Sequence, residues 1–238
     1  MSAARGVAFK LWMYGLLVVM GLLWLPSLLL PRGFAMAGLR LWVRLVLGGL
    51  RVICGVRVEV RGLEHRPAGA MLIAAKHQSM LDTIAPFVVL GDPAYVLKQE
   101  LLSLPFYGWY ARKLGHIAVN REAHAAALKK MVADARSRLA DGRAVLIFPE
   151  GTRQEPGAAP DYKPGVAALY RDLGLPCALL ATNSGEFWPA QGSRFRPGVA
   201  VFEFLEPIPP GLKRGAFMQQ LQERIECAST ALLTGPKG

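Results

Sequence analysis

The chain has 238 residues, 53% of them hydrophobic, and a formal net charge of +11 at pH 7. This length allows one good-sized domain with an appendage, and the apolar content exceeds that of an ordinary soluble domain. The positive charge indicates a polyanionic partner, and the aromatic residues do not alternate with lysine and arginine as on a nucleic-acid platform. We therefore expect a membrane lipid surface as partner and no nucleic acid.

The first expected element is a membrane helix near the N-terminus. No charged residue occurs from Leu11 to Pro31, and a helix of this length spans about 32 Å, enough to cross the hydrocarbon core. Trp12 and Trp24 lie towards its two ends as interfacial anchors, and Pro26 is expected to kink it. A signal peptide is the alternative, but the apolar run is long and no small-residue cleavage site closes it. We therefore predict a retained transmembrane or half-buried helix.

The next segment, Phe34–Val52, predicts a basic amphipathic helix. At about 100° per residue, Arg40, Arg44 and Arg51 share one narrow face. This pattern is typical of a helix lying in the interface with guanidinium groups towards lipid phosphates. A second transmembrane helix is the alternative, although three arginines would be costly there. Residues 1–55 are thus predicted to form a membrane-anchoring hairpin, either crossing the bilayer or half-buried in it.

Residues 56–238 are predicted to form one α/β domain, with a mostly parallel central sheet flanked by helices. After Gly62, short apolar runs alternate with amphipathic segments. Strands are expected at Met71–Ala75, Ala94–Leu97, His116–Val119, Ala144–Phe148, Cys177–Thr182 and Val199–Leu205. Helices are expected at Met80–Leu90, within Leu101–Leu114, and at Glu122–Ala140, Gly165–Leu173 and Lys213–Leu233.

The first candidate catalytic group follows the Met71–Ala75 strand, at a strand end where α/β folds usually place active sites. His77 and Asp82 are five residues apart there. If His77 lies in the turn and Asp82 in the first helical turn, the carboxylate can bind one ring nitrogen and leave the other to accept a proton. Taken alone, this HxxxxD spacing is a weak signal, because a capped helix beside a surface histidine has the same pattern.

The second candidate group is the sequence FPEGTR, which leaves the Ala144–Phe148 strand. Gly151 lets the backbone approach a ligand closely. Thr152 and Arg153 offer a hydroxyl and a bidentate fork suited to phosphate. The alternative is an ordinary turn with a surface ion pair between Glu150 and Arg153.

Two further cations follow strands of the same predicted sheet. Lys98 comes after the Ala94–Leu97 strand, and Arg121 after the His116–Val119 strand. Singly, each is an ordinary surface charge. Together with Arg153, three cations at three strand ends beside a histidine base indicate a phosphate monoester substrate.

In combination these motifs resemble the glycerolipid acyltransferase family, specifically the bacterial 1-acylglycerol-3-phosphate acyltransferases. HQSMLD at 77–82, GHIAVNR at 115–121 and FPEGTR at 148–153 are similar to three family blocks. Smaller similarities are Lys98-Gln99-Glu100-Leu101, Lys163-Pro164-Gly165 and Asn183-Ser184-Gly185. The chain departs from the family at Lys76, where asparagine is frequent, and at Leu179, where a second proline is usual.

The resemblance implies transfer of a fatty acyl group from acyl-CoA or acyl carrier protein to the sn-2 hydroxyl of 1-acylglycerol-3-phosphate, giving phosphatidic acid. His77, oriented by Asp82, would be the general base. The residues expected to bind substrate are Lys98, Arg121, Glu150, Gly151, Thr152 and Arg153. No cofactor or metal is expected, and the widely spaced cysteines Cys54, Cys177 and Cys227 also argue against a metal site. The expected location is the cytoplasmic face of the bacterial inner membrane.

Three alternatives remain open from the sequence. The acceptor is either the lysophospholipid or another lysolipid without a phosphate, such as lyso-ornithine lipid. The second alternative to acyl transfer to the lysophospholipid is a non-catalytic membrane protein that binds lipid. The third is a hydrolase that releases free thiol without any acceptor.

Overall fold

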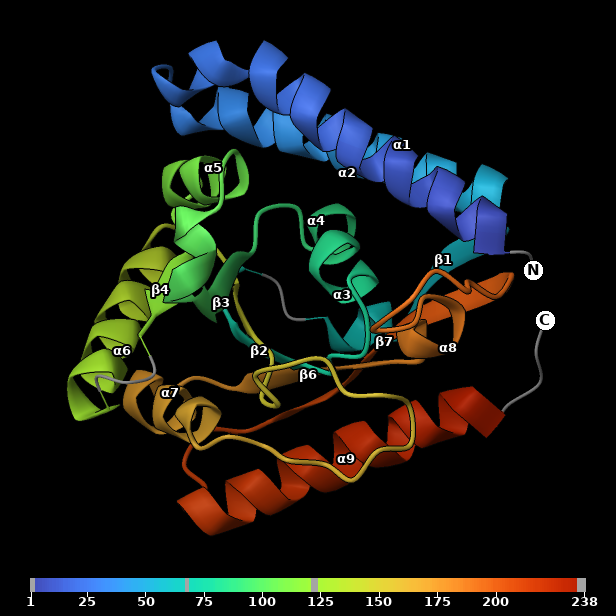
Figure 1. The fold of residues 1–238 in the computed structure, drawn as a ribbon. Helices are drawn as coiled ribbons and strands as arrows, with labels where there is room; N and C mark the ends of the chain where they lie inside the picture. The colour runs from blue at the N-terminus through green and yellow to red at the C-terminus, as the bar shows by residue number, and fades with distance from the viewer. Residues whose placement is uncertain (1–2, 67–68, 121–123, 235–238) are drawn as a thin grey trace.

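The structure, a computed structural model, describes residues 3–66, 69–120 and 124–234, and it is built around one seven-stranded sheet (Figure 1). The strand order is β1-β7-β6-β2-β5-β3-β4, and all neighbours are parallel except β6 and β7. The strands are β1 (Val56–Arg61), β2 (Leu72–Ala75), β3 (Ala94–Lys98), β4 (Ile117–Val119), β5 (Val145–Ile147), β6 (Cys177–Thr182) and β7 (Gly198–Ile208). The predicted α/β class with a mostly parallel sheet is therefore confirmed.

Helices cover both faces of this sheet (Figure 1). One face carries the hairpin of α1 (Ala3–Leu23) and α2 (Arg32–Cys54), joined by the 3₁₀ turn η1 (Leu25–Leu28). The short helices on that side are α3 (Leu81–Ile84), α4 (Pro86–Val89) and α5 (Tyr107–Lys113), the last preceded by the 3₁₀ turn η3 (Gln99–Ser103). The other face is covered by α6 (His124–Ala140), α7 (Gly165–Leu173) and α9 (Arg214–Thr234). Two smaller elements are η2 (Leu63–His65) and α8 (Ser184–Phe187).

The alternating side chains of β2 show how the two cores form. Ile73 and Ala75 belong to the core under the hairpin, whereas Leu72 and Ala74 belong to the core under α6, α7 and α9. All four are buried, which is typical of a parallel strand covered on both faces. The strand is therefore central, and the loop that follows it leaves the middle of the sheet.

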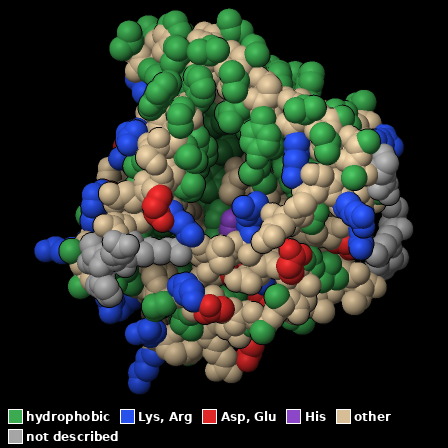
Figure 2. Space-filling view, in the orientation of Figure 1, with side chains coloured by type: hydrophobic (Ala, Val, Ile, Leu, Met, Phe, Trp, Pro, Cys, Tyr) green, Lys and Arg blue, Asp and Glu red, His purple; other side chains and the backbone are tan. Residues whose placement is uncertain are grey.

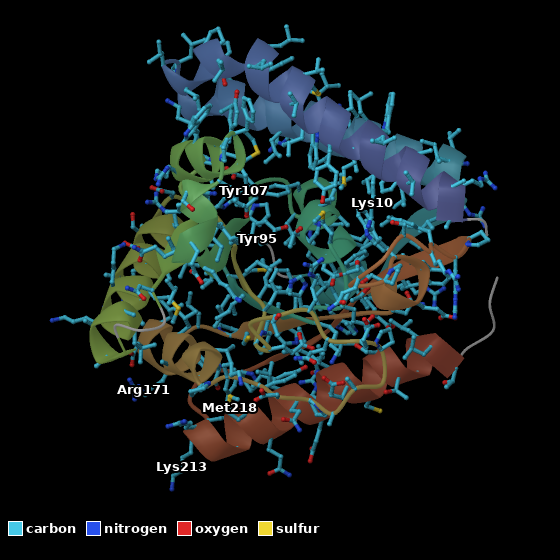
Figure 3. The ribbon with its side chains drawn as sticks, viewed as in Figure 1. Lys10, Tyr95, Tyr107, Arg171, Lys213 and Met218 are labelled. Carbon is cyan, nitrogen blue, oxygen red and sulfur yellow. The ribbon has the colours of Figure 1, made fainter. Side chains whose placement is uncertain are left out.

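The hairpin packs along the domain rather than projecting from it. Near the start of α1, the ring of Phe9 lies 5.1 Å from Trp188 and 5.3 Å from Phe195, measured between ring centroids. Lys10 on the same helix donates from Nζ to the backbone carbonyl of Gly192 (Figure 3). At the other end of α1, the Tyr110 hydroxyl of α5 donates to the carbonyl of Gly21 at 3.0 Å. Both ends of α1 are thus attached to the α/β domain.

The hairpin differs in two details from the sequence expectation. Pro26 does not kink a long helix. Instead, α1 ends at Leu23 and Pro26 is the second residue of the 3₁₀ turn η1, because proline lacks the N–H that would continue the helix. Arg40, Arg44 and Arg51 are all exposed. Arg40, however, donates to the carbonyl of Gly91 at 3.2 Å, so this one of the three arginines contacts the α/β domain. Among the described helices, α1 is the one whose length and composition would allow it to cross a membrane.

Two elements of the α/β domain were not predicted as they occur. The single helix expected at Met80–Leu90 is divided into α3 and α4, because Pro86 cannot donate a backbone hydrogen bond to the preceding turn. Strand β1 was missed, although its sequence VRVEVR alternates apolar and charged residues as an edge strand does. It pairs with β7 at one end of the sheet.

Candidate active site

The histidine and aspartate of the HxxxxD sequence lie together at the carboxyl end of β2. His77 is the second residue after the strand, and Asp82 lies in the first turn of α3. Their side chains meet with 3.2 Å between His77 Nδ1 and Asp82 Oδ2. Since Nδ1 faces the carboxylate, Nε2 is the ring nitrogen left to accept a proton from a substrate. The expected contact between the two side chains is therefore present.

The Asp82 carboxylate is fully buried and fixed at both of its oxygens. Oδ2 accepts hydrogen bonds from the backbone N–H groups of Gln78 at 2.6 Å and Ser79 at 2.8 Å, and Oδ1 accepts from the hydroxyl of Ser184. These donors stabilise the ionised carboxylate and prevent it from turning away from His77. Ser184 was quoted only as part of a family motif, and its contact with Asp82 was not foreseen.

The imidazole of His77 is also held on its face. It stacks on Phe148, with 4.0 Å between ring centroids and 18° between ring planes. The His77 side chain is 13% exposed, so the ring is mostly enclosed but still reaches solvent. Figure 2 shows a hollow below the hairpin that is lined by hydrophobic side chains and has a histidine at its floor. Tyr107 of α5 and Tyr95 of β3 lie on this side of the sheet (Figure 3).

Glu150 has a different position from the one expected. Its side chain is fully buried and forms an ion pair with Lys76, with 2.8 Å between Oε1 and Nζ. Oε2 accepts a hydrogen bond from the backbone N–H of His77 at 2.8 Å. Burial raises the pKa of Glu150 to about 7, although the Lys76 ammonium acts to lower it. The alternative pairing with Arg153 is therefore not seen, because the carboxylate contacts Lys76 and the His77 backbone. The substrate-binding role expected of Glu150 stays a prediction.

The rest of the FPEGTR loop is more exposed. Gly151 adopts a left-handed conformation with φ of 67°, and its N–H donates to the carbonyl of Phe148 at 3.0 Å. That N–H closes a turn, and the substrate-binding role expected of Gly151 stays a prediction. Thr152 and Arg153 are exposed, and Arg153 donates from Nη1 to the carbonyl of Ala190 at 3.2 Å. These two side chains are placed where a ligand can reach them.

The sheet order brings the predicted cationic residues to one edge of the sheet. Strands β2, β5 and β3 are parallel neighbours, so His77 and Arg153, which follow β2 and β5, and Lys98, the last residue of β3, all lie at carboxyl ends of strands. A backbone hydrogen bond of 2.9 Å from Gln154 to the carbonyl of His77 joins the loops after β2 and β5. Lys98 is half-buried at the end of β3. Arg121 lies outside the described residues.

Comparison with known proteins places this arrangement in a family. The family model described as Acyltransferase matches residues 57–180, just over half of the chain. The chain belongs to the acyltransferase family. The matched region contains His77, Asp82, Lys98, Glu150 and Arg153, and the resemblance drawn from the sequence motifs is confirmed.

Individual members of the acyltransferase family are similar over much of the chain. The 1-acyl-sn-glycerol-3-phosphate acyltransferase of Pseudomonas aeruginosa is 40% identical over 157 residues, covering 66% of this chain and 61% of that protein. The 1-acyl-sn-glycerol-3-phosphate acyltransferase alpha of Ovis aries is 31% identical over 175 residues, covering 72% and 61%. The match thus spans 61% of the length of each of these relatives.

A solved structure gives the same fold. The 1-acyl-sn-glycerophosphate acyltransferase of Thermotoga maritima superposes with a TM-score of 0.81 at 21% identity and covers 100% of both chains. The acyltransferase fold of this chain, including the helices that precede the sheet, is therefore shared with that protein.

A second histidine of this acyltransferase has a structural position. His116 precedes β4, and its Nδ1 accepts a hydrogen bond from the backbone N–H of Tyr95 at 3.2 Å. Burial, together with the nearby Arg143, lowers the pKa of His116 to about 3, so the ring stays neutral. Within the described residues, no group of three or more His, Cys, Asp or Glu side chains is placed to hold a metal ion.

Proposed function

We propose that the chain is an O-acyltransferase that moves a fatty acyl group from a thioester donor to the sn-2 hydroxyl of 1-acylglycerol-3-phosphate, giving phosphatidic acid. The observation that carries the proposal is the His77 ring, which is held by Asp82 at Nδ1, stacked on Phe148 and 13% exposed. An acceptor with a long acyl chain and a reactive hydroxyl suits a site that is apolar around one polar base.

The proposed reaction uses His77 as a general base. Nε2 removes the proton from the acceptor hydroxyl, and the oxygen attacks the carbonyl carbon of the thioester. The carbon–sulfur bond then breaks, and the imidazolium gives its proton to the departing sulfur, so that a thiol leaves and His77 is neutral again. Asp82 stabilises that imidazolium, and its two backbone donors keep it in place. A positioned base of this kind contributes about 10²–10⁴-fold in rate.

The acceptor phosphate is proposed to bind the cationic residues beside the base. Arg153 uses Nη1 for the Ala190 carbonyl and has further N–H donors for a phosphate oxygen. Thr152 lies in the loop after β5, Lys98 is the last residue of the neighbouring strand β3, and Arg121 follows β4 in the sequence. Acyl-CoA or acyl carrier protein is proposed as the donor, without a cofactor or metal.

We also propose that the hairpin lies in one leaflet of the bacterial inner membrane, with the α/β domain on the cytoplasmic face. Both ends of α1 are attached to the domain, which argues against a separate crossing helix. Large apolar side chains are exposed on the hairpin elbow and on the neighbouring η3–α5 segment: Leu22, Leu23, Leu29, Leu30, Leu104, Tyr107 and Trp109. Apolar side chains exposed in such a group, rather than singly, are typical of a surface that contacts lipid.

A panel of acceptors tests the function. The purified chain in anionic phospholipid vesicles is given labelled acyl-CoA with 1-acylglycerol-3-phosphate, with lyso-ornithine lipid, or with no acceptor. Labelled phosphatidic acid should form with the phosphate acceptor and be lost in His77→Ala, while vesicle binding stays unchanged. Preferred transfer to the ornithine lipid would replace the proposed acceptor, and thiol release without acceptor would indicate a hydrolase. Absence of turnover with every acceptor would leave a lipid-binding protein.

A further inference from the structure

A buried ionic cluster lies next to the loop that carries His77 and joins four separate parts of the chain. Lys76 at the end of β2 is 2.8 Å from Glu150 Oε1 and 2.6 Å from Glu226 Oε1, measured from its Nζ. Glu226 lies in α9 and also accepts a hydrogen bond from the Tyr162 hydroxyl at 2.9 Å. The cluster therefore connects the C-terminal helix to the loop after β5.

The burial of these groups shows that the ammonium is not a surface charge. The side chains of Lys76, Glu150 and Glu226 are 3%, 0% and 23% exposed. Burial acts to lower the pKa of Lys76, but the two carboxylates outweigh it and raise that pKa above the ordinary value. Because a buried charge is costly without partners, the ammonium depends on both carboxylates.

We propose that Lys76, anchored by Glu226, is a positioning residue for His77. Lys76 holds one oxygen of Glu150, and the other oxygen of Glu150 accepts the backbone N–H of His77. The backbone of the base is therefore connected, through Glu150 and Lys76, to Glu226 in α9. This inference rests on the proposed function, in which His77 is the base, and it gives a role to the residue that departs from the family pattern.

Removing the Lys76 charge and removing the Glu226 charge should change the protonation of Glu150 in opposite directions. Four groups face the Glu150 carboxylate: the Lys76 ammonium, the Glu226 carboxylate, the Tyr162 hydroxyl and the His77 backbone N–H. Loss of the Lys76 charge favours protonated Glu150, which is a weaker acceptor for the His77 N–H. Loss of the Glu226 charge removes a neighbouring negative charge and leaves Lys76 to Glu150 alone, which favours the ionised form.

The experiment compares Lys76→Met with Glu226→Gln in the full-length chain. The matched control is Lys130→Met, which removes a lysine from the Lys130–Asp134 surface pair on α6, where the lysine is 67% exposed. The titration of the Glu150 carboxyl is followed by carbon-13 NMR of labelled glutamate, with its resonance assigned from Glu150→Gln. The same variants are assayed for kcat and KM across pH with the acceptor found for the wild type.

Lys76→Met should raise the Glu150 titration midpoint by about one pH unit or more, and Glu226→Gln should lower it. At pH 7, Lys76→Met should lower kcat by about tenfold or more through misplacement of the base, with little change in KM. The acid limb of the kcat profile should move up in Lys76→Met and down in Glu226→Gln, and Lys130→Met should match the wild type.

Shifts of the same sign in the two variants, or no shift, would overturn the positioning role. If Lys76→Met does not fold, the Glu226→Gln titration decides alone: a lower midpoint supports the inference and an unchanged one refutes it. A wild-type chain without acyl transfer would instead overturn the proposed function, while the NMR titrations would still test the coupling of Lys76 to Glu150.

Discussion

Replacing Asp82 in two ways should separate its structural role from its chemical role. In Asp82→Ala, the buried N–H groups of Gln78 and Ser79 lose their acceptor. Each unsatisfied buried donor costs about 1–3 kcal/mol, so the free energy of unfolding should fall by about 2–6 kcal/mol. This is a large part of the roughly 5–15 kcal/mol that keeps a domain folded.

Asp82→Asn should behave differently because the amide is isosteric. Its carbonyl can still accept from the two backbone N–H groups, and its NH₂ can donate to the Ser184 hydroxyl that now bonds Oδ1. The unfolding free energy should change by less than about 2 kcal/mol. The amide cannot stabilise the His77 imidazolium, so kcat should fall by about 10²–10⁴-fold.

Denaturant unfolding and single-turnover acyl transfer measure the two effects separately. The matched controls are Asp134→Ala and Asp134→Asn, since Asp134 pairs with a lysine on the surface of α6. An Asp82→Ala variant that unfolds with the wild type would show that the carboxylate does not cap the loop. An Asp82→Asn variant with kcat within about threefold of wild type would refute the electrostatic argument.

Three further predictions concern the acceptor, the membrane and pH. Arg153→Ala should raise KM for 1-acylglycerol-3-phosphate by about tenfold or more, because it removes a charge-assisted phosphate contact. The KM for the donor should stay nearly unchanged, and an effect confined to the donor would contradict phosphate recognition. Leu29→Glu at the hairpin elbow, where the side chain is 92% exposed, should weaken vesicle binding in a flotation assay by about tenfold or more. The control is Gln219→Glu on α9, which adds the same charge on the opposite face and should have no effect on vesicle binding. The pKa of Glu150 is raised from 4.5 to about 7, so the folded state keeps this proton to higher pH than the unfolded chain does. The free energy of unfolding should therefore decline as pH rises from 4.5 to about 7. Urea unfolding of Glu150→Gln should show a flatter pH dependence over this range.

The sequence was sufficient for those parts of the fold that depend on local patterns. Apolar runs of four to six residues became buried strands at Leu72–Ala75 and Cys177–Thr182, and the expected helix Gly165–Leu173 has the same bounds in the structure. The His77–Asp82 contact was also accessible, because five residues across a strand end and one helical turn leave few arrangements. Local spacing was enough for both.

Contacts between distant residues were not accessible in the same way. Lys76 and Glu226 are separated by 150 positions, and their meeting depends on the placement of α9 under the sheet. Ser184 and Asp82 are separated by 102 positions and meet because β6 and β2 are neighbours. A sequence pattern without a strand order does not determine either pair.

The inward position of Glu150 also affects how the acceptor is recognised. Within the described part of the chain, Arg153 and Lys98 form no ion pair with a carboxylate. Had Glu150 faced Arg153, as the surface-turn alternative expected, a phosphate would have had to displace a carboxylate before it could bind. Since Glu150 pairs with Lys76 in the interior instead, the Arg153 guanidinium can attract an anionic ligand without first losing a carboxylate partner. The buried cluster that positions the base therefore also leaves the cation beside it available for the acceptor.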